Sequence, residues 1–234
     1  MMLKKDLEDH VAETFRKKWT TRAGQVVPEP ADLLLGNNDA IEFDRATILY
    51  ADLSGSTKLV DEKIWWFAAE IYKNFLHCSG KIIKDQGGTI VSYDGDRVMA
   101  VFLGKSQTST AARCALKINY AVINIINPKL KAQYATSDYE VRHVVGIDTS
   151  EIRAVRTGVR GGNDIVWVGR AANYAAKLTE LNDPPRTWIT ENAYDYLADW
   201  AKEGDDPKRS MWTQYTWTEH ENRTIYGSTW WWDI

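Results

Sequence analysis

The sequence predicts an α+β fold with the ferredoxin-like order of strand, helix, strand, strand, helix and strand. Short apolar runs such as residues 46–50 and 89–92 end at Gly-containing breaks, a pattern typical of buried strands followed by tight turns. Longer segments without such breaks lie between these runs and are expected to be helices. The order of the two kinds of segment indicates the fold class.

The expected elements follow in chain order. An N-terminal helix is expected at residues 3–19, where apolar residues recur at every fourth position, and a linker with Pro and Asn pairs follows at 24–38. The remaining elements are a strand (47–52), a helix (57–85), a hairpin (89–94 and 97–103), a helix (107–127), a second hairpin-like pair (139–148 and 151–158), a short strand (164–168) and two helices (170–181 and 190–200).

The length and composition are those of a small globular protein with a single domain. A chain of 234 residues with 44% hydrophobic residues can bury one substantial core, and a net charge of −3 gives no electrostatic argument for a nucleic-acid or membrane partner. Cys78 and Cys114 lie in apolar helical surroundings and are expected to be reduced. No stretch approaches the roughly twenty apolar residues that span a bilayer. We therefore expect a cytoplasmic protein.

Two segments place a carboxylate at the end of an apolar run. Asp52 follows the first run and precedes the turn Gly55-Ser56-Thr57, and Asp96 follows the second run. Carboxylates at the ends of neighbouring strands can hold hard divalent cations. The backbone N–H groups of a turn that enters a helix can cradle a polyphosphate. Either segment alone is more often a turn former, but together they indicate phosphate chemistry with two metal ions.

A third segment adds polar groups on a helix. The expected strand at 164–168 turns at Gly169 into a helix, on which Asn173 and Lys177 are four residues apart and share one face. A solvated helix face is the simpler interpretation. However, Asn is a poor helix former, which leaves room for a functional reason.

These three ordered segments resemble the class III nucleotidyl cyclases over about residues 43–190. The resemblance implies a ferredoxin-like cyclase catalytic domain that works as a head-to-tail homodimer. It also divides the chain into an N-terminal helix and linker (1–42) and a catalytic domain (43–234) with Trp-rich C-terminal strands. The implied reaction is the cyclisation of a nucleoside triphosphate.

The resemblance also implies roles for individual residues. Asp52 and Asp96 match the two metal-binding aspartates of the family, and the Leu53 carbonyl would be a backbone ligand to one of two Mg²⁺ or Mn²⁺ ions. Asn173 matches the asparagine that steadies the transition state. Lys177 stands where the family usually has an arginine that contacts the triphosphate, so the charge is kept but the bidentate fork is lost.

The positions that read a purine base do not match. Where adenylate and guanylate cyclases have polar base-reading side chains, this chain has Ser92 and Val166, which cannot reproduce the hydrogen bonds to a purine edge. Tyr50 and Arg97 are bulky or charged and would shrink the pocket, which favours a pyrimidine. This pattern resembles the Pycsar pyrimidine cyclases of bacterial antiviral defence. Arg97 is purely a donor, and uracil offers two carbonyl acceptors, so UTP is the expected substrate.

The predicted function is therefore conversion of UTP to 3′,5′-cyclic UMP and pyrophosphate, as a second messenger for a separate effector protein. The alternatives are a cytidylate cyclase, an adenylate cyclase with an altered base pocket, and a catalytically silent nucleotide-binding homologue. A further alternative for Arg97 is that it points outward and pairs with a surface acid.

Two aromatic segments have no role in this chemistry. The tryptophans near the C-terminus are expected to belong to strands that pack on a sheet or on a partner subunit, and they are Trp212, Trp217, Trp230, Trp231 and Trp232. In the implied homodimer, the N-terminal helix and the segment Trp65-Trp66-Phe67 are candidates for interface surface.

Overall fold

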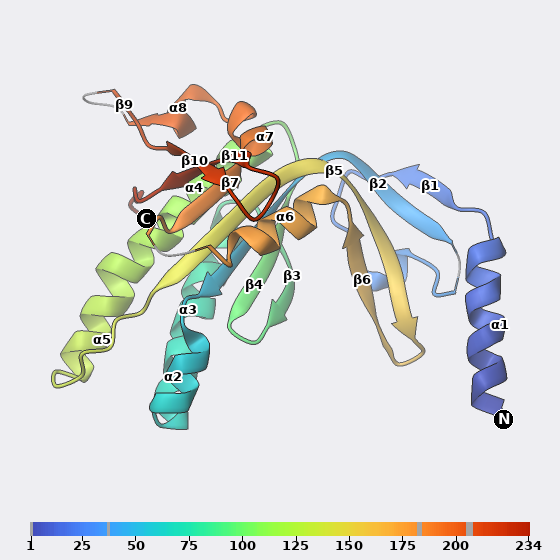
Figure 1. Ribbon diagram of the computed structural model, residues 1–234, viewed down its shortest axis with the longest axis horizontal. Coiled ribbons are helices and arrows are strands. Elements are labelled where there is room, and N and C mark those ends of the chain that lie inside the picture. Colours follow the sequence, from blue (N-terminus) through green and yellow to red (C-terminus); the bar gives the residue numbers. More distant parts are fainter. Residues whose placement is uncertain (1, 37, 182–183, 205–207) are drawn as a thin grey trace.

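The computed structural model describes residues 2–36, 38–181, 184–204 and 208–234 and shows an α+β fold built on one large sheet (Figure 1). The strands of this sheet are β1 (Thr20–Ala23), β2 (Asp39–Leu53), β3 (Thr89–Asp94), β4 (Arg97–Phe102), β5 (His143–Val159), β6 (Gly162–Val168), β7 (Thr187–Thr190), β10 (Thr213–Trp217) and β11 (Arg223–Ser228). Their order is β10-β11-β7-β5-β2-β4-β3, while β1 pairs with β2 and β6 pairs with β5.

Most helices lie between these strands in the chain. They are α1 (Met2–Arg16), α2 (Ser56–Glu62), α3 (Trp65–Asp85), α4 (Gln107–Ala121), α5 (Asn127–Gln133), α6 (Arg170–Leu178), α7 (Glu191–Asp195) and α8 (Asp199–Lys202). A 3-10 turn (Pro30–Asp32), a π-helical turn (Val122–Ile126) and a two-stranded pair, β8 (Glu203–Gly204) with β9 (Arg209–Ser210), complete the described elements. The core order β2-α3-β3-β4-α4-β5, with neighbouring strands β5-β2-β4-β3, confirms the ferredoxin-like prediction.

The two faces of the sheet carry different helices. Leu49 and Leu53 belong to an apolar cluster that also contains Phe75 of α3 and residues of α4. Ile48 belongs to a second cluster that contains the alanines of α6. Because side chains alternate between the faces of a strand, Tyr50 and Asp52 lie on the face that carries α6.

A glycine allows α6 to lie close to the sheet. A Cβ atom at Gly146 of β5 would overlap the carbonyl oxygen of Ala175. Since no other residue lacks a Cβ, this position brings the α6 backbone directly against the centre of the sheet.

One expected hairpin is wrong. In place of the pair expected at 139–148 and 151–158, residues 143–159 form a single strand, β5, which pairs with β2 and then continues against β6. The polar residues in the middle of β5 look like a turn in the sequence, but tertiary contacts satisfy their hydrogen-bonding groups. Asp148 is fully buried and accepts two hydrogen bonds from Arg170, and Thr149 accepts a hydrogen bond from Thr47.

Several element boundaries also differ from expectation. The single helix expected at 57–85 is divided into α2 and α3 because Lys63 and Ile64 have extended backbone angles. The helix expected at 107–127 continues through the π-helical turn into α5. Pro128, which has no N–H group to donate, occupies the first turn of α5. The strand expected at 47–52 begins eight residues earlier, at Asp39, and neither β1 nor β7 was expected.

The C-terminal tryptophans pack on their own chain. Trp212 and Trp217 are buried, and Trp230 and Trp232 pack against the main core, whereas Trp231 is 51% exposed. The Trp232 amide donates to the Leu116 carbonyl of α4. The last residues therefore lie along α4, and only β10 and β11 belong to the expected Trp-rich strands.

Cys78 and Cys114 are free thiols, as expected, and Cys114 is buried. Across the part of the chain that the structure describes, no helix has both the length and the apolar composition to cross a membrane.

Candidate active site

The structure brings the two predicted aspartates together. Asp52 is the next-to-last residue of β2, and Asp96 lies in the turn between β3 and β4. This turn contains Gly95 in a left-handed conformation, with φ 61°. Because β2 pairs with β4 next to this turn, with Ala51 opposite Val98, the two carboxylates reach the same region. They are close enough for the charge of Asp96 to act on Asp52.

The electrostatics of this pair suit a cation. Burial, and after it the charge of Asp96, raises the pKa of the Asp52 carboxyl to about 6, and the charge of Arg97 opposes this rise. The Oδ2 atom of Asp96 is buried and has no hydrogen-bond partner. Two close carboxylates with an unpartnered buried oxygen fit a hard divalent cation, which prefers oxygen ligands. Within the described residues, no cluster of three His, Cys, Asp or Glu side chains exists, so further protein ligands would come from backbone atoms such as the Leu53 carbonyl.

Asp52→Asn is expected to stabilise the metal-free protein at neutral pH. The pKa of Asp52 is higher in the folded than in the unfolded chain, so folding favours the protonated acid, and this contribution is lost as the pH rises from about 4 through about 6. At about pH 7.5 the ionised carboxylate therefore opposes folding. Its removal should raise the free energy of unfolding by about 1–2 kcal/mol, allowing for partial exposure to solvent. Chemical denaturation in the presence of a chelator measures this difference.

The control for this measurement is Asp85→Asn, which removes an exposed carboxylate at the end of α3 and should leave stability unchanged. Addition of Mn²⁺ should raise the melting temperature of the wild type but not that of Asp52→Asn. If Asp52→Asn were less stable than the wild type in chelator, the carboxylate would be a structural acceptor and not part of a cation site.

The turn after Asp52 has the geometry expected for the start of a helix. Gly55 has φ 74° and directly precedes α2, so the N–H groups of Ser56 and Thr57 lie at its first turn. Tyr72 of α3 was not identified from the sequence. It forms a side-chain hydrogen bond with Ser56, and burial, followed by the charge of Asp96, raises the pKa of its hydroxyl. The phosphate-binding role of the turn stays a prediction.

The predicted base-reading residues contact each other beside Asp52. Tyr50 lies two residues before Asp52, and the guanidinium of Arg97 lies 5.4 Å from the centre of the Tyr50 ring. Arg97 also pairs with Asp94 at 3.6 Å, and the Asp94 side chain is 83% exposed. The expected alternative, an ion pair with a surface acid, is therefore present together with the contact to Tyr50. The Arg97 guanidinium has five N–H donors, so the ion pair with Asp94 and the contact with the Tyr50 ring can form together.

Asn173 and Lys177 lie on the outer face of α6. Both are exposed, whereas Ala171, Ala175 and Leu178 are buried against the sheet. Among the described residues, neither Asn173 nor Lys177 has a side-chain hydrogen bond or an ion pair. The structure therefore holds these two groups together, but it does not bring them into contact with the aspartates of the same chain.

The α6 helix is linked to the carboxylates by its last turn. Thr179, which follows Leu178, forms a side-chain hydrogen bond with Asp52 and lowers its pKa slightly against the effect of burial. Thr179 was not identified from the sequence, because nothing in its local pattern shows that the end of α6 reaches the end of β2. It places the C-terminal end of α6 at the carboxylates, while Asn173 and Lys177 lie on the exposed face of the helix.

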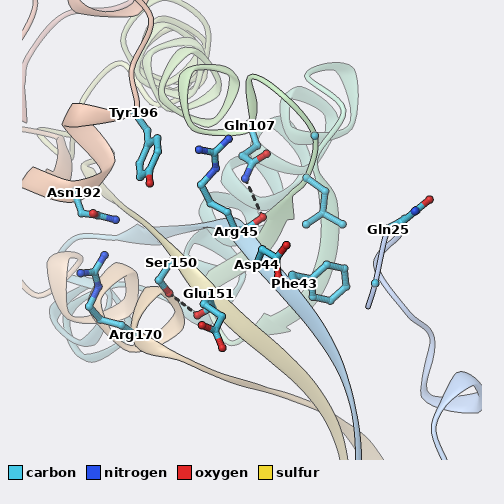
Figure 2. Close-up of a pocket in the computed structure, with 13 residues that line it drawn as sticks. Gln25, Phe43, Asp44, Arg45, Gln107, Ser150, Glu151, Arg170, Asn192 and Tyr196 are labelled. Carbon is cyan, nitrogen blue, oxygen red and sulfur yellow. Dashed lines mark hydrogen bonds between the residues drawn. The ribbon is translucent and has the colours of Figure 1, made fainter. Parts of the chain in front are cut away.

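A cavity of about 840 Å³ lies beside residues Phe43, Asp44 and Arg45 of β2, away from Asp52 (Figure 2). Its two arginines are already engaged. Arg170 makes a bidentate ion pair with the buried Asp148, and the guanidinium of Arg45 lies 4.4 Å from the centre of the Tyr196 ring. None of the predicted site residues lines this cavity. It is therefore separate from the carboxylate pair, where the metal and phosphate chemistry is expected.

The chain is similar in sequence to proteins of one known family. Residues 39–215 match the family model described as the adenylate and guanylate cyclase catalytic domain. A uridylate cyclase from Burkholderia cepacia is 52% identical over 100% of both chains, and one from Xanthomonas perforans is 49% identical over 100% of both. A uridylate cyclase from Rhodovulum sp. is 37% identical and covers 99% of this chain and 98% of its own.

Solved structures of cyclases share the fold at low sequence identity. The guanylyl cyclase Cya2 superposes with a TM-score of 0.67 at 16% identity, covering 80% of this chain and 92% of its own. The adenylyl cyclase CyaB from P. aeruginosa has a TM-score of 0.62 at 20% identity, covering 81% and 95% of the two chains. At these identities the likeness shows the fold alone.

Proposed function

Because the chain belongs to the adenylate and guanylate cyclase catalytic-domain family, we propose that it converts UTP to 3′,5′-cyclic UMP and pyrophosphate, with each site shared by two copies of the chain. The observation that carries the choice of uracil is the contact between Arg97 and Tyr50 beside Asp52. The three relatives named uridylate cyclases, which match nearly the whole chain, support the same choice.

The proposed reaction joins the ribose 3′-oxygen to the α-phosphorus of UTP, while pyrophosphate leaves in line and the hydroxyl proton passes to water. Asp52, Asp96 and the Leu53 carbonyl would hold two Mg²⁺ or Mn²⁺ ions. When bound, such ions lower the pKa of an attacking hydroxyl and neutralise a leaving polyphosphate. The backbone N–H groups of Ser56 and Thr57 would orient the triphosphate at the start of α2.

The remaining charge on the transferring phosphoryl group needs fixed donors. Asn173 and Lys177 supply an amide and an ammonium on one exposed face of α6. Within one chain neither side chain contacts the carboxylates, so we propose that this face serves the carboxylates of a second copy in a head-to-tail homodimer. Donors that are held in place before the reaction stabilise developing charge without reorganisation.

Recognition of the base follows from donor and acceptor chemistry. Arg97 has only donors, and a uracil ring has two carbonyl acceptors in place of the one carbonyl and one amino group of cytosine. Val166 lies on the exposed side of β6 and has no polar atom to meet a purine edge. A cytidylate cyclase is the second candidate, since Asp94 beside Arg97 is an acceptor that can meet the cytosine amino group. The third candidate is an adenylate cyclase with an altered base pocket, and the fourth is a catalytically silent nucleotide-binding homologue.

The experiment that tests this proposal is incubation of the purified protein with ATP, GTP, CTP or UTP and Mn²⁺, with products identified by mass spectrometry. UTP is expected to be cyclised far faster than ATP or GTP. Arg97→Ala should lower turnover of UTP by about tenfold to a hundredfold, because a hydrogen bond from a charged donor is worth roughly 1.5–3 kcal/mol. Arg97→Lys keeps the charge and serves as the matched control for electrostatics alone.

Two results would change the proposal. Preferential cyclisation of CTP by the wild type would keep the pyrimidine pocket and replace uracil with cytosine. Equal losses on all four nucleotides in Arg97→Ala would assign Arg97 to phosphate binding or to the Asp94 pair.

The biological role proposed here rests on the resemblance to the Pycsar cyclases. We propose that cyclic UMP is a second messenger in bacterial antiviral defence, made in the cytoplasm and recognised by a separate effector protein. Neither nucleic acids nor membranes are proposed as partners.

A further inference from the structure

The helix that carries the proposed phosphate-stabilising donors is tied to the sheet at its first residue. Arg170, which begins α6, donates to the two carboxylate oxygens of Asp148 on β5 at 2.9 and 3.1 Å and to the Thr149 carbonyl at 2.8 Å. One planar guanidinium makes all of these bonds, so they fix both its distance from β5 and its orientation. This bidentate pair, here called the α6 anchor, locates the start of α6.

Stability alone explains the buried Asp148 carboxylate poorly. Asp148 is fully buried, and burial raises its pKa, although the Thr190 hydroxyl and Arg170 both oppose this rise. A buried ion pair gives little net stability, because the loss of hydration of two charges offsets their attraction. Such a pair can instead fix one arrangement of the elements that it joins. The arrangement that the α6 anchor fixes is that of α6 on β5.

Two further contacts attach the same end of the helix. The Ser150 hydroxyl accepts from the Ala171 N–H at 3.0 Å, which satisfies one of the amides that a helix leaves open at its start. Gly169, at the N-cap position, has no side chain that could do this, and a Cβ atom there would overlap the Glu151 carbonyl oxygen. Residues 148–150 of β5 therefore hold the start of α6.

The α6 anchor lies on the same helix face as the donors. Arg170 precedes Asn173 by three residues and Lys177 by seven, and these are the spacings of one face. The Arg170 guanidinium also lies 5.6 Å from the centre of the ring of Tyr174, which follows Asn173 in the chain. The anchored residue is therefore a near neighbour of the first donor.

The other end of α6 is attached as well, through the hydrogen bond between Thr179 and Asp52. A helix held at both ends keeps the residues between them in place. If the first attachment is loosened, α6 can tilt about the second, and Asn173 and Lys177 move with it. A displacement of about 1 Å far from the reacting atoms can already cost about a hundredfold in rate.

We propose that Arg170, through its bidentate pair with Asp148, is a positioning residue for nucleotide cyclisation that holds Asn173 and Lys177 where they meet the transferring phosphoryl group. This inference rests on the proposed function, since it concerns the donors of that reaction. Arg170 does not touch the substrate in this role. Its effect is on the transition state, where the donors act, more than on binding of the nucleotide.

The test is Arg170→Lys, which keeps a positive charge beside Asp148 but cannot form the bidentate pair. The kcat for the nucleotide that the wild type cyclises fastest is expected to fall by about tenfold to a hundredfold, because the donors are displaced. The KM should stay about unchanged, since the lost interaction belongs to the transition state. Arg153→Lys is the matched control and should keep a normal kcat, because Arg153 of β5 pairs with Glu42 of β2.

Two further measurements separate positioning from a general loss of stability. If Arg170 acts through the donors, Arg170→Lys and Lys177→Ala together should lower kcat by less than the product of their separate effects. Hydrogen exchange measured by mass spectrometry should be faster in α6 of Arg170→Lys than in the wild type, and unchanged in Arg153→Lys. The exchange measurement needs no activity, so it tests the α6 anchor independently of the substrate.

The outcomes distinguish this inference from the proposed function. A normal kcat in Arg170→Lys, beside an active wild type, would reject the positioning role alone. Effects of Arg170→Lys and Lys177→Ala that multiply would mean that Arg170 supports the fold as a whole, and a raised KM with normal kcat would assign it to nucleotide binding; both would overturn the inference. A wild type that cyclises none of the four nucleotides would reject the proposed function and the positioning role with it.

Discussion

Asp52→Ala and Asp96→Ala are each expected to lower cyclic UMP formation by more than about a thousandfold without unfolding the protein. Loss of one fixed donor in a closed active site already costs roughly a hundredfold to a thousandfold. Loss of a carboxylate from the pair removes a cation-binding group and with it both activation of the 3′-hydroxyl and neutralisation of pyrophosphate. Mass spectrometry of the products at saturating Mn²⁺ measures the loss, and circular dichroism checks that the fold is intact.

Asp85→Ala is the matched control, because it removes an aspartate from the exposed end of α3. It should retain normal activity. Near-normal turnover in either Asp52→Ala or Asp96→Ala would reject the assignment of the pair to metal binding, whatever the effect on stability.

The second large effect is expected when two inactive variants are mixed. Asp52→Ala lacks a carboxylate and Asn173→Ala lacks a donor on α6, so each should be inactive alone. In a heterodimer, one of the two sites combines the intact carboxylates of one chain with the intact α6 face of the other. Random exchange makes half of the dimers heterodimers with one working site in two, so activity should return to about a quarter of the wild-type value.

The mixture needs proof that subunits exchange, for example by native mass spectrometry of chains with different tags. A mixture of Asp52→Ala with Asp96→Ala is the control, because both variants damage the same half of the site and no heterodimer site is intact. Exchange without recovery in the first mixture would mean that one chain contains a complete site. It would then require α6 to move, since Asn173 and Lys177 are exposed and do not contact the carboxylates in this structure.

Local pattern alone determined much of the candidate site. Carboxylates that follow short apolar runs and precede Gly turns predict strand ends, and both Asp52 and Asp96 lie where this pattern puts them. The left-handed conformations of Gly55 and Gly95 belong to turns that favour glycine for lack of a Cβ. The helical spacing of Asn173 and Lys177 is likewise a short-range property. Such features depend on neighbours in the chain, so a single sequence contains them.

Only the tertiary structure decided where polar segments continue a strand and which groups meet. The polar middle of β5 forms a strand because Arg170 satisfies Asp148 and Thr47 satisfies Thr149, and these partners are distant in sequence. The raised pKa of Asp52 likewise depends on burial and on Asp96, which the pairing of β2 with β4 brings near. The sequence determined which residues stand at turns, strand ends and helix faces, because those preferences are local. Burial and charge–charge distances depend on the packing of the whole chain, and so they appear only when the sheet is assembled.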